Sequence, residues 1–453
     1  MSTAAIIGGG ITGLTAAWKL RQSGFETHLF EASGRVGGPI HSRRENGYLA
    51  ELGPNTLLDT TPVIGELIAG LGLGDRLLRS QPGAQKRFIL KHGKPAEIPS
   101  SPAAFFTSPF FSANAKLRLL REPTVARAPA DAEESLAEFV LRRLGREFLD
   151  YAINPFVAGV YAGDPAKLSV REAFPRLHAL EQKYGSLIVG QILGARERKR
   201  RGTRSKQDAA KLSFDEGLEV LPQSLGESLG DRLHLESPVT RLTRDGKGWR
   251  LLAPGGQKRF DAVLLALPAY ALAKIEIEGA DLAELAQIEY PPVASVVFGF
   301  RREDVAHPLD GFGTLVPEVE NRSVLGTLFS SSLFANRAPE GHVTLSSYLG
   351  GTRAPELARR DPEEILALTL EDLRAAYGIE GEPTFRHLHV FAKAIPQYNL
   401  GYGRYRELMD RTEGECPGLF FAGHSRDGIS LSDSLASGHD RAAKVEAHLS
   451  AGA

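Results

Sequence analysis

The chain has 453 residues, of which 42% are hydrophobic and 24% are charged, so it is long enough for two or three globular domains. Its formal net charge of −1 argues against nucleic-acid binding, and it has no apolar run long enough to cross a membrane. The single cysteine, Cys416, cannot form an intrachain disulfide, which fits a reducing compartment. We therefore expect a cytoplasmic protein and leave peripheral contact with the inner face of the cell membrane open.

The N-terminal segment predicts a nucleotide-binding unit. Residues 3–7 form a short apolar run typical of a buried strand, and residues 8–13 match G-x-G-x-x-G. A helical pattern follows until Gly24, and a second strand over residues 27–30 ends at Glu31. A glycine motif alone is a weak signal. Strand, glycine turn, helix, strand and acid in this order are typical of a βαβ dinucleotide-binding unit.

Each glycine of the motif has its own role in this interpretation. Gly8 permits a tight turn, Gly10 lets the backbone approach a pyrophosphate, and Gly13 lets the helix pack against the strand. The helix N-terminus stabilises the phosphate charge with its N–H groups and its dipole. Glu31 would accept hydrogen bonds from a ribose.

Residues from about 100 to 205 read as mostly helical. Ser135 and Glu138 have the spacing of a capping box at a helix start. Residues 197–206 are basic and contain glycine and serine, which predicts a mobile loop.

An aromatic and basic cluster in this helical segment suits a lipid surface. It consists of Phe105, Phe106, Phe110, Phe111, Lys116, Arg118 and Arg121. Aromatic rings beside cations are typical of membrane interfaces, but the same phenylalanines could equally be buried.

The second half of the chain predicts two sheets. Residues 212–214 read as a strand before a helix over 217–229, and residues 233–266 alternate like antiparallel strands. Residues 290–395 look like a second sheet with one long helix over 361–377, which begins with a cap, a proline and two acids.

Three segments resemble the flavoprotein oxidases of the amine-oxidase superfamily. They are residues 31–38 with the pattern E-x-x-x-R-x-G-G, residues 51–56, and residues 418–423 followed by 428–431. The resemblance implies non-covalent FAD that contacts both ends of the chain. The implied FAD contacts are Gly8, Gly9, Gly10, Ile11, Thr12, Gly13, Glu31, Ala32, Arg35, Gly38, Pro39, Gly53, Pro54, Asn55, Thr56, Val239, Gly423, Ile429, Ser430 and Leu431.

The expected fold class is α/β and α+β, with a Rossmann-type FAD-binding domain, a mixed-sheet substrate domain and a helical insert. We assign residues 1–80, 207–268 and 396–453 to the FAD-binding domain. The substrate domain takes 81–100 and 269–395, and the insert takes 101–206.

Longer segments are similar to the protoporphyrinogen oxidase family over nearly the whole chain. They are residues 154–169, 173–177, 184–186, 311–317, 326–331, 336–339 and 395–401. The resemblance implies oxidation of a porphyrinogen to an aromatic porphyrin with loss of six electrons. A hydride would pass from a bridging carbon to FAD, and dioxygen would reoxidise the flavin to give hydrogen peroxide. Because the cofactor carries this chemistry, we expect no catalytic side chain and no metal, and no histidine lies in a metal-binding pattern.

The same resemblance implies five substrate-binding residues. Arg87 matches the arginine that binds a substrate carboxylate, and Leu315 and Leu328 match two leucines that hold a pyrrole ring. Tyr348 replaces a phenylalanine, so its hydroxyl needs a partner. Gly159 matches the position whose carbonyl would accept pyrrole N–H groups.

Some positions depart from the family pattern. Pro39 follows Gly38, Glu216 stands where a second glycine is common, and the pair at 424–425 is His-Ser instead of an Asn-containing pair. We expect FAD binding to survive these changes, with altered affinity.

Alternatives stay open for the reaction and the assembly. Coproporphyrinogen III, with four carboxylates instead of two, is the nearest alternative substrate to protoporphyrinogen IX. An amine oxidase and a non-catalytic binding protein on the same fold are more distant. Cys416 precedes the turn at Gly423 and so lies on the wrong side for a covalent flavin link. The expected partners are the porphyrinogen and dioxygen, and a homodimer is left open.

Overall fold

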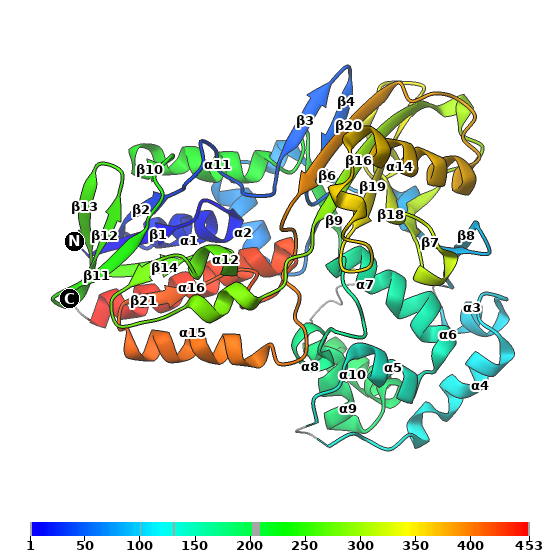
Figure 1. The fold of residues 1–453 in the computed structure, drawn as a ribbon, viewed down its shortest axis with the longest axis horizontal. Coiled ribbons are helices and arrows are strands. Elements are labelled where there is room, and N and C mark those ends of the chain that lie inside the picture. The colour runs from blue at the N-terminus through cyan, green and yellow to red at the C-terminus, as the bar shows by residue number, and fades with distance from the viewer. Residues whose placement is uncertain (1, 100, 130–131, 202–208, 452–453) are drawn as a thin grey trace.

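The computed structural model describes residues 2–99, 101–129, 132–201 and 209–451. A parallel sheet covered by helices lies at the end of the molecule where both termini meet, and a mixed sheet lies at the other end (Figure 1). A group of helices lies beside the mixed sheet. The expected combination of a Rossmann-like parallel sheet and a mixed sheet is confirmed.

The parallel sheet has five strands in the order β10–β2–β1–β14–β21. Its strands are β1 (Thr3–Ile7), β2 (Glu26–Phe30), β10 (Leu233–His234), β14 (Ala262–Leu265) and β21 (Leu419–Phe421), and its main helices are α1 (Ile11–Gln22), α2 (Pro62–Gly70), α11 (Val220–Leu229) and α16 (Leu431–Ala451). Side chains of β1 alternate between two cores. Ala4 and Ile6 pack on the side of α1 and α16, and Ala5 and Ile7 belong to the core on the other face.

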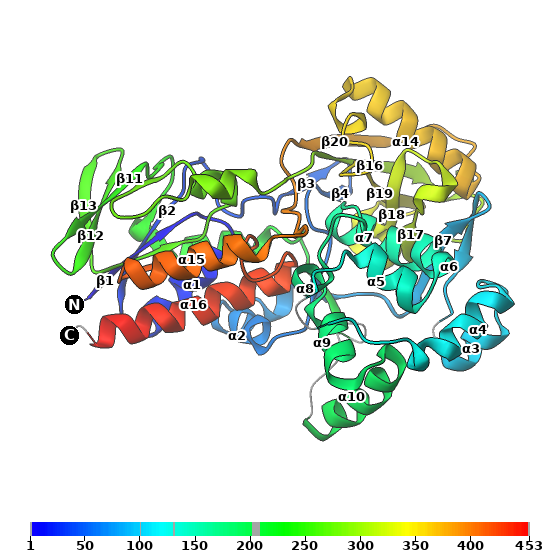
Figure 2. The ribbon, with the colours of Figure 1, turned by 60° about the horizontal axis from the view of Figure 1, so that its bottom comes forward.

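The first and last helices cross at very close range. A Cβ added to Gly438 of α16 would lie 2.2 Å from the carbonyl oxygen of Thr12 in α1, so no side chain fits there. Figure 2 shows α16 beside α1, with α15 (Gly403–Glu415) next to them. This contact fixes the C-terminal segment against the glycine motif.

A four-stranded sheet covers the second face of the parallel sheet. Its order is β13–β12–β11–β15, formed by β11 (Arg241–Asp245), β12 (Gly248–Ala253), β13 (Gly256–Phe260) and β15 (Glu276–Ile277). The prediction of antiparallel strands over 233–266 is right for β11 to β13. It is wrong for β10 and β14, which are parallel members of the central sheet. An apolar run such as that of β14 is buried on both faces, which is typical of a parallel strand.

The mixed sheet has seven strands in the order β20–β16–β19–β18–β17–β7–β8. They are β20 (Phe385–Phe391), β16 (Val293–Arg301), β19 (His342–Gly350), β18 (Val324–Phe329), β17 (Gly311–Leu315), β7 (Lys86–Lys91) and β8 (Lys94–Glu97). Helix α14 (Pro362–Tyr377) packs on one face through Ile365, Leu373 and Tyr377. Its predicted start is confirmed, since the Asp361 side chain accepts a hydrogen bond from the Glu363 amide at 3.0 Å.

Short elements connect these layers. They are β3 (Ser42–Glu45) paired with β4 (Tyr48–Glu51), the small sheet of β5 (Leu57–Leu58), β9 (Lys211–Phe214) and β6 (Leu77–Arg79), and the helices α12 (Ala269–Leu272) and α13 (Ser330–Leu333).

The helical segment contains α3 (Pro102–Thr107), α4 (Ala113–Arg121), α5 (Leu136–Arg143), α6 (Arg146–Phe148), α7 (Asn154–Tyr161), α8 (Val170–Ala173), α9 (Pro175–Tyr184) and α10 (Leu187–Arg201). The predicted capping box of Ser135 and Glu138 is confirmed at the start of α5. The loop predicted from residue 197 is wrong up to Arg201, because α10 continues through it. Arginine and lysine are good helix formers, so a basic run does not end a helix. Residues 202–206 of that prediction lie outside the described residues.

Candidate functional site

The glycine motif forms a tight turn between β1 and α1. Gly8 has a φ of +112°, and a Cβ there would lie 2.4 Å from the Ala266 carbonyl oxygen. A Cβ on Gly13 would lie 2.0 Å from the Gly8 carbonyl oxygen. The roles predicted for Gly8 and Gly13 therefore match the backbone contacts, because a side chain at either position would disrupt the turn.

The space beside Gly10 is open. A Cβ at Gly10 would meet no protein atom within 4 Å, although its neighbours in the motif are tightly packed. The first backbone hydrogen bond of α1 runs from the Leu14 N–H to the Gly10 carbonyl at 3.0 Å. The amides of Ile11 and Thr12 precede that bond and lie at the N-terminus of a 12-residue helix. This combination of free space and helix N–H groups suits a pyrophosphate.

Glu31 is fixed at the end of β2. Its carboxylate accepts hydrogen bonds from the Gly9 amide at 2.6 Å and from the Ser33 amide at 2.8 Å and hydroxyl at 2.7 Å. A carboxylate has about four acceptor positions, so capacity is left for a ribose hydroxyl. Ala32 lies between these residues and is exposed.

The segment after Glu31 folds back onto the glycine motif. The Gly37 amide donates to the Gly9 carbonyl at 2.8 Å, and a Cβ on Gly38 would lie 3.7 Å from the Gly10 Cα. The Arg35 guanidinium donates to the Gly38 carbonyl at 2.6 Å and to the Ile40 carbonyl at 3.1 Å. Arg35 thus closes this turn beside the space at Gly10.

The predicted loop over residues 51–56 lies against the same turn. A Cβ on Gly53 would lie 2.0 Å from the Pro39 carbonyl oxygen, so this contact requires glycine. Pro54 and Thr56 flank Asn55, whose side-chain amide donates to the Tyr348 hydroxyl. Asn55 therefore joins the predicted cofactor loop to a predicted substrate residue.

The C-terminal motif reaches the first helix. Gly423 has a φ of +106°, and a Cβ there would lie 3.7 Å from the Thr12 side chain. Ile429, Ser430 and Leu431 lead into α16. Val239, the other predicted contact, is buried in the core below the parallel sheet.

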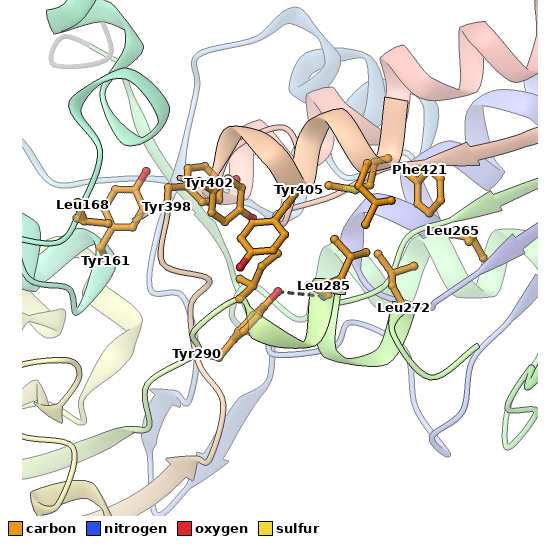
Figure 3. Close-up of a cluster of buried hydrophobic side chains, with 14 of the residues drawn as sticks. Tyr161, Leu168, Leu265, Leu272, Leu285, Tyr290, Tyr398, Tyr402, Tyr405 and Phe421 are labelled. Carbon is orange, nitrogen blue, oxygen red and sulfur yellow. Dashed lines mark hydrogen bonds between the residues drawn. The ribbon is translucent and has the colours of Figure 1, made fainter. Parts of the chain in front are cut away.

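Tyrosine hydroxyls form hydrogen bonds with the backbone of the turn after Gly423. The Tyr398 hydroxyl donates to the His424 carbonyl and accepts from the Gly428 amide at 3.1 Å. The Tyr402 hydroxyl donates to the Ser425 carbonyl at 2.6 Å. Figure 3 shows Tyr161, Tyr398, Tyr402 and Tyr405 following one another through this cluster. Sequence reasoning missed the roles of Tyr398 and Tyr402, because their partners are backbone atoms that no side-chain pattern reveals.

Two departures from the family pattern have a structural explanation. Burial lowers the pKa of His424 to about 4, and its ring lies 3.3 Å from the Tyr290 hydroxyl. His424 is therefore a neutral side chain at neutral pH. Glu216 needs no glycine-like conformation and forms an ion pair with Arg44 at 2.6 Å, whereas the next residue, Gly217, has a φ of +92°.

Four predicted substrate residues lie on one face of the mixed sheet. In β7, β18 and β19, the residues Phe88, Phe329 and Leu349 point into the core under α14. Because side chains alternate along a strand, the adjacent Arg87, Leu328 and Tyr348 point to the opposite face. In β17, Thr314 pairs with Phe88 and shares its face, which places the next residue, Leu315, on the opposite face. We call this the substrate face; it consists of Arg87, Leu315, Leu328 and Tyr348.

Helix α7 approaches the substrate face at Gly159. A Cβ on Gly159 would lie 2.5 Å from a methyl group of Leu315, so the glycine permits this approach. Arg87 is exposed at one side of the face, on β7. Tyr348 lies three strands away on β19, where Asn55 contacts it. Burial raises the pKa of Tyr348, so its hydroxyl stays neutral. Asn55 is the hydrogen-bond partner that this hydroxyl was expected to need.

The aromatic cluster expected at a lipid surface is divided. Phe110 and Phe111 are 5% and 6% exposed, and Phe111 stacks on Phe148 at 4.5 Å between ring centres. In contrast, Phe106 is 46% exposed and Leu120 is 60% exposed. No helix among the described residues has both the length and the apolar character to span a bilayer.

No group of histidine, cysteine and acidic residues in the described part of the chain could hold a metal ion. The groups at the end of β1 instead fit a dinucleotide. They are a helix N-terminus, a space that a side chain at Gly10 would fill, and the fixed carboxylate of Glu31.

Comparisons with known proteins agree with this geometry. Residues 11–445 match the family model of flavin containing amine oxidoreductases. The chain is 35% identical to protoporphyrinogen oxidase 2 of Arabidopsis thaliana, over 98% of this chain and 94% of the relative. It is 28% identical to coproporphyrinogen III oxidase of Bacillus subtilis, over 96% of this chain and 95% of the relative.

Solved structures share the fold over the full length. A crystal structure from Exiguobacterium sp. superposes with a TM-score of 0.82 at 26% identity, covering 98% of this chain and 99% of that one. Cyclohexylamine oxidase from Brevibacterium oxydans superposes with a TM-score of 0.70 at 19% identity, covering 99% of each chain. The latter shows a common fold alone.

Proposed function

The chain belongs to the flavin containing amine oxidoreductase family, within its group of protoporphyrinogen and coproporphyrinogen oxidases, and from that membership we propose a specific reaction. The proposed reaction is the oxygen-dependent, six-electron oxidation of protoporphyrinogen IX to protoporphyrin IX, with hydrogen peroxide as the second product. Family membership implies FAD, and we propose that it is bound without a covalent link.

One observation carries the proposal. The substrate face places an exposed cation, Arg87, on one strand and Tyr348 with its link to Asn55 three strands away. Leu315 and Leu328 lie on the strands between them. An apolar surface between a cation and a cofactor loop suits a flat apolar substrate with carboxylates at one edge.

Each side chain then has a binding role. Arg87 binds a propionate carboxylate as a charge-assisted pair, and Leu315 and Leu328 hold a pyrrole ring. The Gly159 carbonyl accepts pyrrole N–H groups, and Tyr348 stacks on the macrocycle. FAD held beside Gly10 and Glu31 would supply the redox chemistry, as acceptor of hydride and donor of electrons to dioxygen. The protein orients the substrate, and no side chain is proposed as a base.

Coproporphyrinogen III stays the alternative substrate, because the Bacillus subtilis relative carries that name and matches nearly the whole chain. The relatives named protoporphyrinogen oxidase have the higher identity, which favours the proposal.

Anaerobic mixing tests the proposed reaction without dioxygen. We expect the flavin absorbance of the purified protein to bleach with protoporphyrinogen IX and to stay unchanged with putrescine or cyclohexylamine. Bleaching by an amine and by no porphyrinogen would establish an amine oxidase and reject the proposal. Admission of air should restore the absorbance with formation of hydrogen peroxide.

A further inference from the structure

Lys211 of β9 is a buried lysine for which the described part of the chain provides no anionic partner. Its exposed fraction is only 7%, and its ammonium group lies 5.5 Å from the centre of the Phe312 ring. Among the residues that the structure describes, no carboxylate lies within ion-pair distance of it. Lysine is rarely buried unless it is paired, so this position needs an explanation.

A second lysine shows what a paired one looks like. Lys91 of β7 has a side-chain exposure of 15%, and its ammonium lies 3.4 Å from the Glu147 carboxylate. It also donates to the Phe110 carbonyl and lies 4.5 Å from the centre of the Tyr151 ring. Lys91 is therefore satisfied within the protein, whereas the contact of the Lys211 ammonium group with the described residues is with an aromatic ring.

Phe312 places this ammonium group at the substrate face. A Cβ on Gly311 would lie 2.6 Å from the Phe88 ring, so position 311 faces the core under α14. The next residue, Phe312, therefore faces the other side, where it packs with Ala84 and Leu333. The pairing of β17 with β7 shifts register between Gly311 and Thr314, which brings Leu315 to that same side.

Arg87 is the charged neighbour of Lys211. Burial lowers the pKa of the Lys211 ammonium, and the positive charge of Arg87 lowers it further. Arg87 itself has no ion pair among the described residues and is exposed. Two cations near each other, one of them desolvated, are unfavourable unless an anion lies between or beside them.

We propose that Lys211 binds a second carboxylate of the substrate, beside the carboxylate that Arg87 binds. The two side chains together would hold an edge of the macrocycle that carries two carboxylates. This inference rests on the proposed function, because the anion is the porphyrinogen. It adds a specificity residue from outside the mixed sheet, since β9 belongs to the small sheet with β5 and β6.

The test compares the free diacid of protoporphyrinogen IX with its uncharged dimethyl ester. The measured quantity is the ratio of KM for the ester to KM for the diacid. Lys211→Met removes the charge and keeps the side-chain length. Lys94→Met is the matched control, since Lys94 is an exposed lysine on β8 of the mixed sheet.

We expect Lys211→Met to lower this ratio by about tenfold or more, because a hydrogen bond to a charged group contributes roughly 1.5–3 kcal/mol. Lys94→Met should leave the ratio as in the wild type, and Lys211→Arg should restore most of it. A ratio in Lys211→Met equal to that of the wild type would overturn the inference. So would an equal rise of KM for diacid and ester, because a purely structural role affects both substrates alike.

The flavin absorbance of each variant reports on folding. If Lys211→Met loses its flavin, Lys211→Gln and Lys211→Arg provide the comparison, and equal ratios in these two would also overturn the inference. Failure of the proposed function looks different, because the wild-type enzyme would then oxidise neither diacid nor ester.

Discussion

At the scale of single residues, the open space beside Gly10 gives a sharp test of the cofactor site. Gly10→Val should fold normally, since a Cβ at this position meets no protein atom within 4 Å, but it should purify without FAD. Flavin absorbance per protein measures retention. The control is Gly65→Val, an exposed position in α2 that also has open space. A yellow Gly10→Val variant with full flavin content would reject the assignment of this site.

Arg87→Ala tests the carboxylate site. KM for protoporphyrinogen IX should rise by roughly tenfold to a hundredfold with a smaller change in kcat, because mainly ground-state binding is lost. Steady-state kinetics with the purified holoenzyme measure both constants. The control is Arg322→Ala, because Arg322 pairs with Asp372 away from this face. A large loss of kcat at unchanged KM would contradict a binding role.

His424 links stability to pH. Burial lowers its pKa to about 4 from an ordinary value of 6.5, so the unfolded chain binds the extra proton between these values. The favourable contribution is complete above pH ~6.5 and is lost as the pH falls toward ~4, by an amount on the order of 3 kcal/mol. His424→Gln should flatten the fall of the Tm over this range. The exposed His92→Gln should not. Equal slopes for His424→Gln and the wild type would contradict the assignment.

Residue roles were predictable where they depend on local backbone. Gly8 and Gly13 shape a turn within a short stretch whose order of elements is visible in the sequence. The bond between Asn55 and Tyr348 joins residues 293 positions apart, and no local pattern predicts such a contact. The sequence indicated only that the Tyr348 hydroxyl needs a partner, and it did not indicate which residue that partner is.

At the scale of elements, the helical segment depends on a buried ion cluster. Arg143 is fully buried, pairs with Glu122, and donates to Glu181 at 2.8 Å and to the Gly185 carbonyl at 2.9 Å. Glu122 also accepts from the Leu187 amide at 2.9 Å. This cluster therefore ties α5 to the start of α10.

Arg143→Met should destabilise the helical segment by about 3–5 kcal/mol, because the buried Glu122 would lose the cation that it pairs with, although Glu181 would keep its pair with Arg142. Faster limited proteolysis within residues 101–201 and a lower Tm are the expected readouts. Arg146→Met is the control. Arg146 pairs with Asp150, but its side chain is 72% exposed, so this ion pair contributes little to stability. An unchanged proteolysis rate in Arg143→Met would show that the cluster does not hold the segment.

The type of each element could be predicted from the periodicity of the sequence. The neighbours of each strand in its sheet could not. The helix α14 and the capping box of α5 were predictable from local signals. Strand β14 was assigned to the wrong kind of sheet because its neighbours, β1 and β21, come from the two ends of the chain. The basic run in α10 shows that charge alone does not determine whether a segment is a loop.

At the scale of the whole molecule, the two chain ends meet at the proposed cofactor site. Strands β1 and β21 share a sheet, and Gly438 lets α16 lie directly on α1 (Figure 2). The glycine motifs at both ends predicted that they would meet. The division into a cofactor domain, a substrate domain and an insert stays a proposal. So does membrane contact, for which the exposed Phe106 and Leu120 are the remaining apolar candidates.

The substrate face could not be predicted from the sequence as a surface. Its members come from four strands, and the register shift in β17 decides which side Leu315 faces. The family resemblance named its residues one by one. The pairing of strands then brought them to one side of the mixed sheet, and brought the buried Lys211 near Arg87.

The most direct test measures porphyrin fluorescence in air with protoporphyrinogen IX and, separately, with coproporphyrinogen III. A heat-denatured sample corrects for autoxidation of both substrates. We expect enzyme-dependent fluorescence with a much larger kcat/KM for protoporphyrinogen IX. A preference for coproporphyrinogen III would contradict the proposed substrate, and no enzyme-dependent signal with either would contradict the proposed reaction altogether.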